Sequence, residues 1–147
     1  MSATAFATVA AALLAALNTA PALAGGRISA NRMRPIPAGQ NTAIVLRLDA
    51  SEGAEFTLGV TDWQTRFAVE CYARASASAD AAAAVDALLF DAWARLCSLD
   101  FSALGASVSM APKVDWQYDD TDSPTVCAVI HLVAQHQTTT ASLATRT

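Results

Sequence analysis

Four stretches of this 147-residue chain have the pattern of a β-strand, and in three of them apolar and polar side chains alternate with a period of two. This is the pattern of a β-strand that buries one face. The four stretches are residues 43–49, 65–74, 106–119 and 125–136. In the second, the apolar side chains share one parity: Phe67, Val69, Cys71 and Ala73. The fourth is apolar on both parities, which indicates a buried strand. The chain therefore has to form a sheet and cover at least one face of it.

Two other stretches repeat their apolar residues at helical spacing. Residues 4–18 are the first, and Asn18 and Pro21 end it. The second is 76–99, with Ser78 as its N-cap. Its apolar stripe consists of Val85, Leu88, Leu89, Ala92, Leu96 and Leu99. On the same helix Asp91 and Arg95 are spaced to form a weak ion pair.

The connecting segments are read from their turn residues. Residues 19–42 hold three prolines and three glycines and predict a long basic loop, extended around "RMRPIP". Residues 50–55 predict a turn and 56–60 a short strand. Pro112 predicts an edge strand or a bulge. The "DDTDSP" segment, 119–124, predicts a turn. We expect residues 1–3 and 138–147 to be flexible.

The order of elements is helix, strand, strand, long helix, strand, strand. It predicts a single α+β domain over residues 1–147. Its mainly antiparallel sheet has four to five strands, and two helices pack on one face. No stretch is long and apolar enough to predict a membrane span.

The net charge of −4 conceals an asymmetry. Residues 1–48 carry four arginines and no acid, and the remainder carries all thirteen acids against five bases. Such a chain is not expected to bind nucleic acid specifically. Opposite charges within one chain do suit head-to-tail contact between copies. Alternatively, the arginines are simply solvated.

No linear signature of catalysis or cofactor binding is present, and we expect neither an enzyme nor a cofactor. His131 and His136 are five residues apart on a strand, so they should point to opposite faces and not share a metal. The acids Asp119, Asp120 and Asp122 lack the spacing of a calcium loop. The three cysteines, Cys71, Cys97 and Cys127, have no disulfide spacing and are expected to be small core residues.

Two tryptophans, Trp63 and Trp116, lie at a turn and on the predicted edge strand. They are expected in the core, with a subunit interface as the alternative.

The stretch "ALLAALNTAPALAGGR" resembles the end of a secretory signal peptide, because small residues follow an apolar run. If it were cleaved, the protein would be a small exported domain of unknown binding function. Residues 1–26 contain no Lys or Arg, however, and the apolar run has a helical stripe. We therefore expect a retained amphipathic helix.

The chain resembles the tail terminator proteins of long-tailed phages over roughly residues 5–140. The resemblance lies in the order of the elements and in five stretches. These are "ATVAAALLAAL", "RISANRMRPIPAGQNTAIVLRL", "TRFAVECYARA", "ADAAAAVDALLFDAWARL" and "DWQYDDTDSPTVCAVIHLVAQHQT".

The resemblance implies a structural virion protein without catalytic residues. Such proteins form a ring, commonly hexameric, that caps the tail tube, stops its polymerisation and provides a head-joining surface. The implied partners are other copies of the chain, the tail tube protein and a head–tail connector. The implied location is the virion, and the host cytoplasm during assembly.

From the charges and aromatics of this sequence we expect a set of subunit or partner contacts. The basic members are Arg27, Arg32, Arg34, Arg47 and Arg74. Their expected partners on a neighbour are Glu52, Glu55, Asp119 and Asp120, with Trp63 and Trp116 as apolar contacts.

Overall fold

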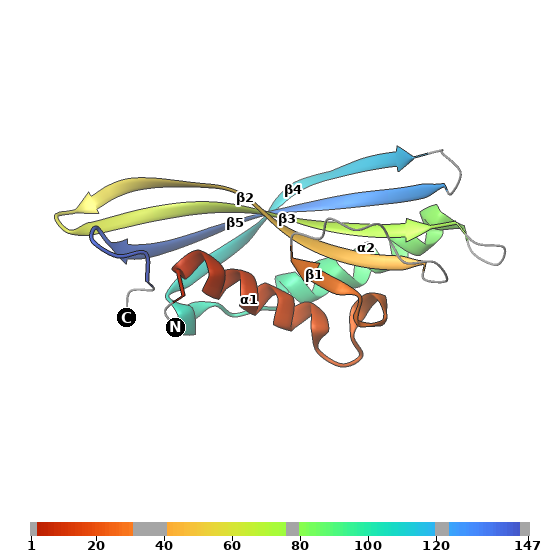
Figure 1. Ribbon diagram of the computed structural model, residues 1–147, viewed down its shortest axis with the longest axis horizontal. Helices are drawn as coiled ribbons and strands as arrows, with labels where there is room; N and C mark the ends of the chain where they lie inside the picture. Colours follow the sequence, from red (N-terminus) through yellow and green to blue (C-terminus); the bar gives the residue numbers. More distant parts are fainter. Residues whose placement is uncertain (1–2, 31–40, 76–79, 120–123, 145–147) are drawn as a thin grey trace.

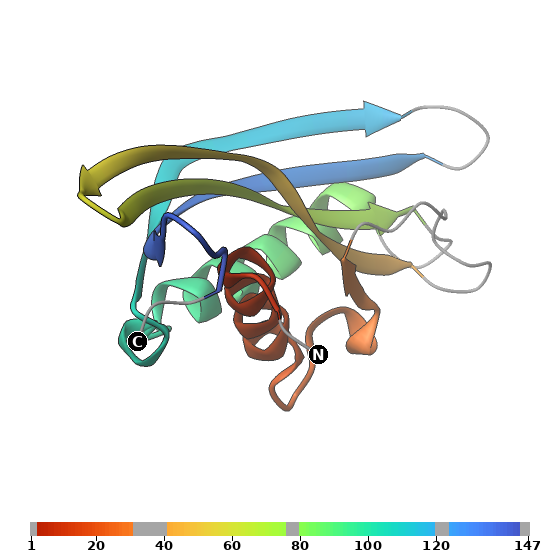
Figure 2. The ribbon, with the colours of Figure 1, turned by 60° about the vertical axis from the view of Figure 1, so that its left-hand side comes forward.

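The computed structural model describes residues 3–30, 41–75, 80–119 and 124–144. It forms one α+β domain, in which two helices lie on the same face of a five-stranded sheet (Figures 1 and 2). The strand order across the sheet is β1-β2-β3-β5-β4. The predicted fold class is therefore confirmed, including the placement of both helices on one side.

The main elements are α1 (Ala5–Asn18), β1 (Ile28–Ala30), β2 (Thr42–Thr57), β3 (Val60–Arg74), α2 (Ala81–Cys97), β4 (Ala106–Asp119) and β5 (Thr125–Thr139). Two short 3-10 helices, η1 (Leu23–Gly26) and η2 (Ser102–Leu104), precede β1 and β4. The short β1 pairs parallel to β2, and the other neighbours pair antiparallel. The sheet is thus mainly antiparallel, as predicted.

The four long strands are longer than the helices that cover them. They contain 14 to 16 residues each and so span roughly 46–53 Å. The helices have 14 and 17 residues, or about 21 and 26 Å. One consequence is visible in Figure 1, where the hairpin of β2 and β3 projects beyond the helix layer.

The turn predicted at residues 50–55 is wrong. β2 runs through this stretch, and the chain reverses at Leu58 and Gly59, where Gly59 has φ +82°. Residues 56–60, predicted as a short strand, therefore contain the turn. From Arg47 onward β2 is exposed on nearly every residue. Because neither face is buried there, the apolar alternation that identifies a strand is missing.

The first helix begins and ends within one residue of the prediction, 4–18. The hydroxyl of Thr4 caps it by accepting a hydrogen bond from the Ala7 N–H at 3.2 Å. Val9, Leu13 and Leu17 lie on one stripe and are buried against the sheet. Each such side chain contributes about 1.5–3 kcal/mol when it is fully buried. The opening segment is therefore part of the hydrophobic core.

The second helix buries most of its predicted stripe, with Leu89 and Leu99 only half-buried. Its N-cap is Asp80, whose carboxylate accepts from the Ala82 N–H at 3.1 Å. The predicted cap, Ser78, lies outside the described residues.

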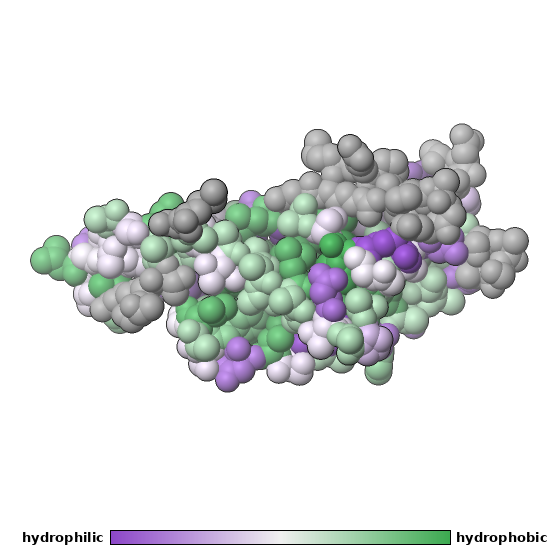
Figure 3. All heavy atoms as spheres, turned by 60° about the horizontal axis from the view of Figure 1, so that its bottom comes forward, coloured by the Kyte–Doolittle hydropathy of each residue, from purple (hydrophilic) through white to green (hydrophobic). Residues whose placement is uncertain are grey.

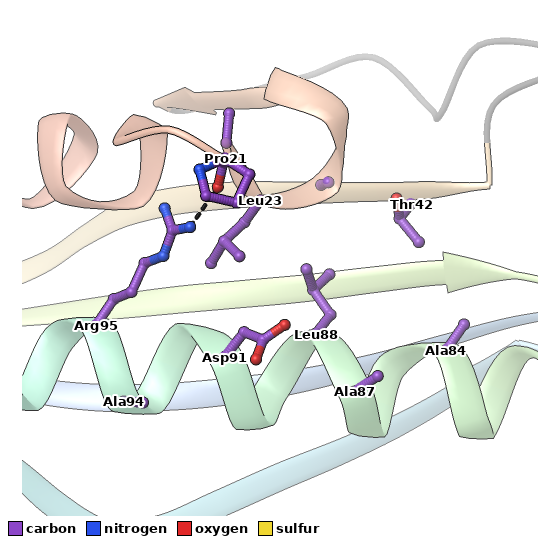
Figure 4. Close-up of a pocket in the computed structure, with 11 residues that line it drawn as sticks. Pro21, Leu23, Thr42, Ala84, Ala87, Leu88, Asp91, Ala94 and Arg95 are labelled. Carbon is purple, nitrogen blue, oxygen red and sulfur yellow. Dashed lines mark hydrogen bonds between the residues drawn. The ribbon is translucent and has the colours of Figure 1, made fainter.

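Arg95 of α2 holds the end of α1. Its guanidinium donates to the carbonyls of Leu17 at 3.0 Å and Thr19 at 2.6 Å, and also to that of Pro21 (Figure 4). These carbonyls belong to the last turn of α1 and the residues after it, where no intrahelical partner is available. Arg95 binds these carbonyls in place of the weak ion pair that was predicted between Arg95 and Asp91.

Two predicted loose segments are more ordered than expected. The loop predicted at 19–42 contains η1 and β1, with Leu23 buried. The tail predicted to be flexible from 138 begins inside β5, where Thr138 is fully buried. Beyond the strand, the Leu143 carbonyl accepts a hydrogen bond from the Ala5 N–H at 2.7 Å. Leu23 and Ala24 belong to the buried core, and Ile28 packs against it, although the prolines and glycines around them indicate a loop. The hydrogen bond to Ala5 is a contact that a hydrophobic pattern does not reveal. Residues 31–40 of the predicted loop lie outside the described residues.

The strand β4 lies at one edge of the sheet, and its pairing with β5 is interrupted between Met110 and Val114. The edge strand and the irregularity predicted from Pro112 are both confirmed. None of the described helices is long and apolar enough to cross a membrane.

The core contact of α1 gives a direct test. We expect Leu13→Ala, at a fully buried position, to lower the free energy of unfolding in urea by about 2–5 kcal/mol, because it leaves a cavity. Leu58→Ala, at a 96% exposed position, should change it by about 0.5 kcal/mol or less. Equal losses from the two variants would contradict the packing of α1.

Candidate subunit interface

Two groups of large apolar side chains remain exposed although the domain has a well-packed core. At the turn of the β2–β3 hairpin, Phe56 and Leu58 are 63% and 96% exposed. Along α2 and β4, Phe90, Trp116 and Tyr118 are 76%, 43% and 65% exposed. Gathered apolar side chains on a surface commonly mark a contact with another molecule.

The first group, Phe56 and Leu58, is the hairpin tip. It forms the far end of the projecting hairpin, the apolar left-hand end of the molecule in Figure 3. The sequence between Leu48 and Thr65 carries four acids and no base, and Glu52 and Glu55 are exposed there. The hairpin tip therefore exposes two apolar side chains at the end of an acidic hairpin.

Phe90 of the second group lines a groove of about 410 Å³ between α2 and β4, whose other walls are Asp86, Leu89, Trp93, Ala94 and Val114. Trp116 and Tyr118 follow Val114 at steps of two along β4, so they share its face. We name the set Leu89, Phe90, Trp93, Val114, Trp116 and Tyr118 the aromatic groove.

The aromatic groove exists because α2 packs over β3 and β5 and leaves β4 largely uncovered. The residue pairs between β4 and β5 show which side chains are left uncovered. Trp116 lies opposite Ala128 and Tyr118 opposite Val126. Both β5 residues are buried in the cluster around Val85, whereas their aromatic partners on β4 are exposed. The helix-facing side of β4 is thus apolar without a helix over it.

The opposite, open face of the sheet carries a polar network around Glu70, which is itself buried. Arg47 donates to Asp49 at 2.7 Å and to Glu70 at 3.4 Å. Tyr72 donates to the other carboxylate oxygen of Glu70 at 2.7 Å. Burial, together with this hydrogen bond, raises the pKa of Tyr72. Arg47, predicted as a subunit contact, is therefore already engaged within the chain.

The two histidines lie on opposite faces, as predicted. His131 pairs across the sheet with Ala68 on the open face, and its Nε2 lies 2.6 Å from a carboxylate oxygen of Asp115. That hydrogen bond lowers the pKa of Asp115. His136 is on the helix face.

A second polar cluster lies beneath the start of α1. The Nε2 atom of His136 is 2.9 Å from the Thr65 hydroxyl, and the ring of Phe6 meets His136 edge-on. Within the described part of the chain no partner reaches the buried Nδ1. Burial lowers the pKa of His136. A proton added at Nδ1 would also find no acceptor there.

Trp63 is half-buried and belongs to this cluster. Its indole N–H donates to the Thr138 hydroxyl at 2.9 Å, and its ring stands edge-on to Phe6 at 5.2 Å. Trp63 is not among the buried core residues, so the interface alternative stays a prediction for both Trp63 and Trp116.

Of the remaining arginines predicted as subunit contacts, two lie in the described part of the chain and two lie outside it. Arg27 donates to the Thr42 carbonyl at 2.7 Å and so joins the start of β1 to β2. Arg74 is the last residue of β3 and is half-buried. Its backbone N–H donates to the Asn41 carbonyl at 2.7 Å. Arg32, Arg34 and Asp120 lie outside the described residues.

The predicted acids fall at opposite ends of the sheet. Glu55 pairs with Thr61 near the hairpin turn, and Asp119 lies at the end of β4 that faces Thr125. The 13 steps of β3 from Thr61 to Arg74 correspond to about 43 Å. Arg74 therefore cannot reach Glu55 within one copy.

Several surface residues escaped prediction from the sequence: Phe56, Leu58, Asp86, Phe90 and Tyr118. A usable signal existed for two of them. Phe90 lies off the apolar stripe of its helix, and Tyr118 shares its parity with Trp116. An aromatic residue placed away from the expected core face indicates a contact surface.

The cysteines are structural where they are buried. Burial raises the pKa of Cys71 to about 12 and that of Cys127 to about 11, so both thiols are protonated at neutral pH. Cys97, predicted in the core, is instead exposed at the last turn of α2, because it lies off the apolar stripe.

No protein-family model matches this chain, and no curated protein matches it. Among the described residues, no group of three or more His, Cys, Asp or Glu side chains could hold a metal ion. The features of the molecule that bear on its function are therefore the hairpin tip, the aromatic groove and the distribution of charge.

The buried histidine predicts a pH dependence of stability. Because the folded state lowers the pKa of His136, the unfolded chain binds more protons near that pKa. The free energy of unfolding should therefore fall as the pH drops below about 6.5. Urea denaturation at several pH values between about 5.5 and 7.5 measures this fall.

We expect His136→Gln to flatten that dependence, because it removes the buried imidazole that binds fewer protons in the folded state. A pH dependence that persists unchanged in His136→Gln would show that another group causes it.

Proposed function

We propose that this protein is a structural assembly protein whose copies join side by side into a ring, and that the ring caps the tail tube of a long-tailed phage. The resemblance to tail terminator proteins suggests a hexamer that stops tube polymerisation and offers a surface to the head. The role needs no catalysis and no cofactor. It belongs to the virion, after assembly in the host cytoplasm.

One sequence pattern carries the proposal: the segments of the chain next to the two edge strands carry opposite charge. Arg27 precedes the edge strand β1, and the sequence continues through Arg32 and Arg34 before β2 begins. The other edge strand, β4, ends at Asp119, and Asp120 follows it in the sequence. A basic segment beside one edge strand and an acidic segment beside the other favour a heterologous contact between copies, which closes into a ring when the rotation allows.

This contact sets the orientation of each copy in the proposed ring. Neighbours meet edge to edge, so the long strands run roughly along the ring axis. The hairpin tip, with Phe56 and Leu58 exposed, would then project from one rim. We propose that this rim contacts the tail tube protein and that the opposite rim contacts the head–tail connector.

The alternative, an exported domain that loses its first 24 residues, has less support. Cleavage would remove α1 and with it Leu13 and Leu17, both fully buried in the core. It would also remove the carbonyls that Arg95 binds. The geometry therefore favours retention of the helix, which the intact mass of the protein from its native source would test.

The ring predicts an oligomer that weakens with salt. In sedimentation velocity at about 0.05 M salt, we expect one discrete closed species as concentration rises, and a shift toward monomer at about 0.5 M salt, because exposed charge pairs are screened. Arg34→Glu should raise the concentration needed for assembly about tenfold, the effect of losing about 1.4 kcal/mol.

The matched control is Arg66→Glu, which makes the same charge change at an exposed position in the middle strand β3. It should assemble like the unmodified chain. A monomer under every condition, or a ring that neither salt nor Arg34→Glu affects, would overturn the charge-driven ring.

A further inference from the structure

We propose that the aromatic groove binds the segment of residues 31–41, "NRMRPIPAGQN", of a second copy of this chain. The inference rests on the proposed ring and names the two surfaces that meet in it. We name residues 31–41 the Arg/Pro segment.

The chemistry of the groove suits a proline-containing extended peptide. Phe90 lines the cleft together with Leu89, Trp93 and Val114. Trp116 and Tyr118 are exposed and continue the same face of β4 beyond Val114. Peptides held extended by Pro dock on aromatic-lined grooves at a low cost in conformational entropy. The Arg/Pro segment has Pro35 and Pro37 on either side of Ile36, which supplies three apolar side chains for such a groove.

The charges also match. The cationic members of the segment are Arg32 and Arg34. Asp86 lies in the wall of the groove. The only basic residue of α2, Arg95, is committed to the carbonyls after α1. The groove therefore presents the carboxylate of Asp86 to an arginine-bearing peptide, and paired charges across an interface help fix its register.

The length of the segment sets how far it can reach. Ala30 pairs with Leu46, so the chain has to return only four residues along β2 to start at Thr42. That return is about 14 Å, counting one strand spacing. The 11 steps from Ala30 to Asn41 can extend about 36 Å. The slack lets the segment extend outward by up to about 17 Å from the sheet edge.

The slack does not bring the segment to the groove of its own copy. β1 and β4 are opposite edges, separated by four strand spacings, which is about 19 Å. Both helices lie on the face that the segment would have to cross (Figure 2). A neighbour that brings its β4 edge beside β1 removes this distance. The occupant is therefore a second copy.

Photo-crosslinking tests the contact. Benzoylphenylalanine at position 90 replaces an aromatic side chain that is 76% exposed, so the core is untouched. The matched control carries it at position 56, an exposed Phe on the hairpin. Each protein is mixed with an equal amount of ¹⁵N-labelled unmodified chain, irradiated at low salt, digested and analysed by mass spectrometry.

We expect position 90 to cross-link to the peptide containing residues 31–41 of the labelled chain, and position 56 not to do so. Cross-links that join position 90 only to unlabelled peptide of its own copy, or to another region, would overturn the proposal. Rings that form normally without the predicted cross-link would overturn the groove contact and leave the proposed ring standing. Absence of any ring would overturn both.

A charge swap supplies a second test. Asp86→Arg should raise the concentration needed for ring assembly about tenfold, and Arg34→Glu should do the same. The double variant should recover most of the loss, because the pair is restored with reversed signs. Losses that simply add in the double variant would show that these two residues do not meet. Circular dichroism melting of each variant confirms that the fold is retained.

Discussion

The length of the strands relative to the helices is the constraint on which the rest of this structure depends. Strands of 14 to 16 residues are about twice as long as either helix. Two helices therefore cover the middle of one sheet face and leave the hairpin tip and the β4 side of that face open. Leu13 and Leu17 are fully buried because they lie between α1 and the sheet. Leu58 is exposed because the hairpin tip lies beyond the helices, and Phe90 is exposed because it lies off the buried stripe of α2.

The same constraint explains why assembly is the proposed role. Exposed aromatic and apolar side chains at two separate places are costly in a protein that works alone, but they are useful in a protein that must meet two different partners. The aromatic groove lies at a sheet edge and suits a neighbouring copy. The hairpin tip lies at the end of the strands and suits a partner along the ring axis. In the proposed ring, the opposite charges of the segments that follow the two edge strands would give the lateral contact its direction.

The sequence predicted those parts of the fold in which one face is buried. Phe67, Val69 and Cys71 alternate because the helix layer lies over them, and their strand was predicted. The outer half of β2 lacked that pattern, because both of its faces meet solvent, and a turn was predicted there instead. Trp116 was predicted as a contact alternative from its edge strand. The groove around it could not be predicted, because it depends on where α2 packs across the sheet.

The most direct test of the account is the length of tail tubes, measured by electron microscopy. The tubes would be assembled from the tail tube protein of a long-tailed phage, with and without this chain. The account predicts tubes of unlimited length without the chain and shorter tubes with a ring at one end when it is present. Leu58→Asp should keep the ring and lose the caps. Tubes whose length and ends do not respond to the chain would contradict the account.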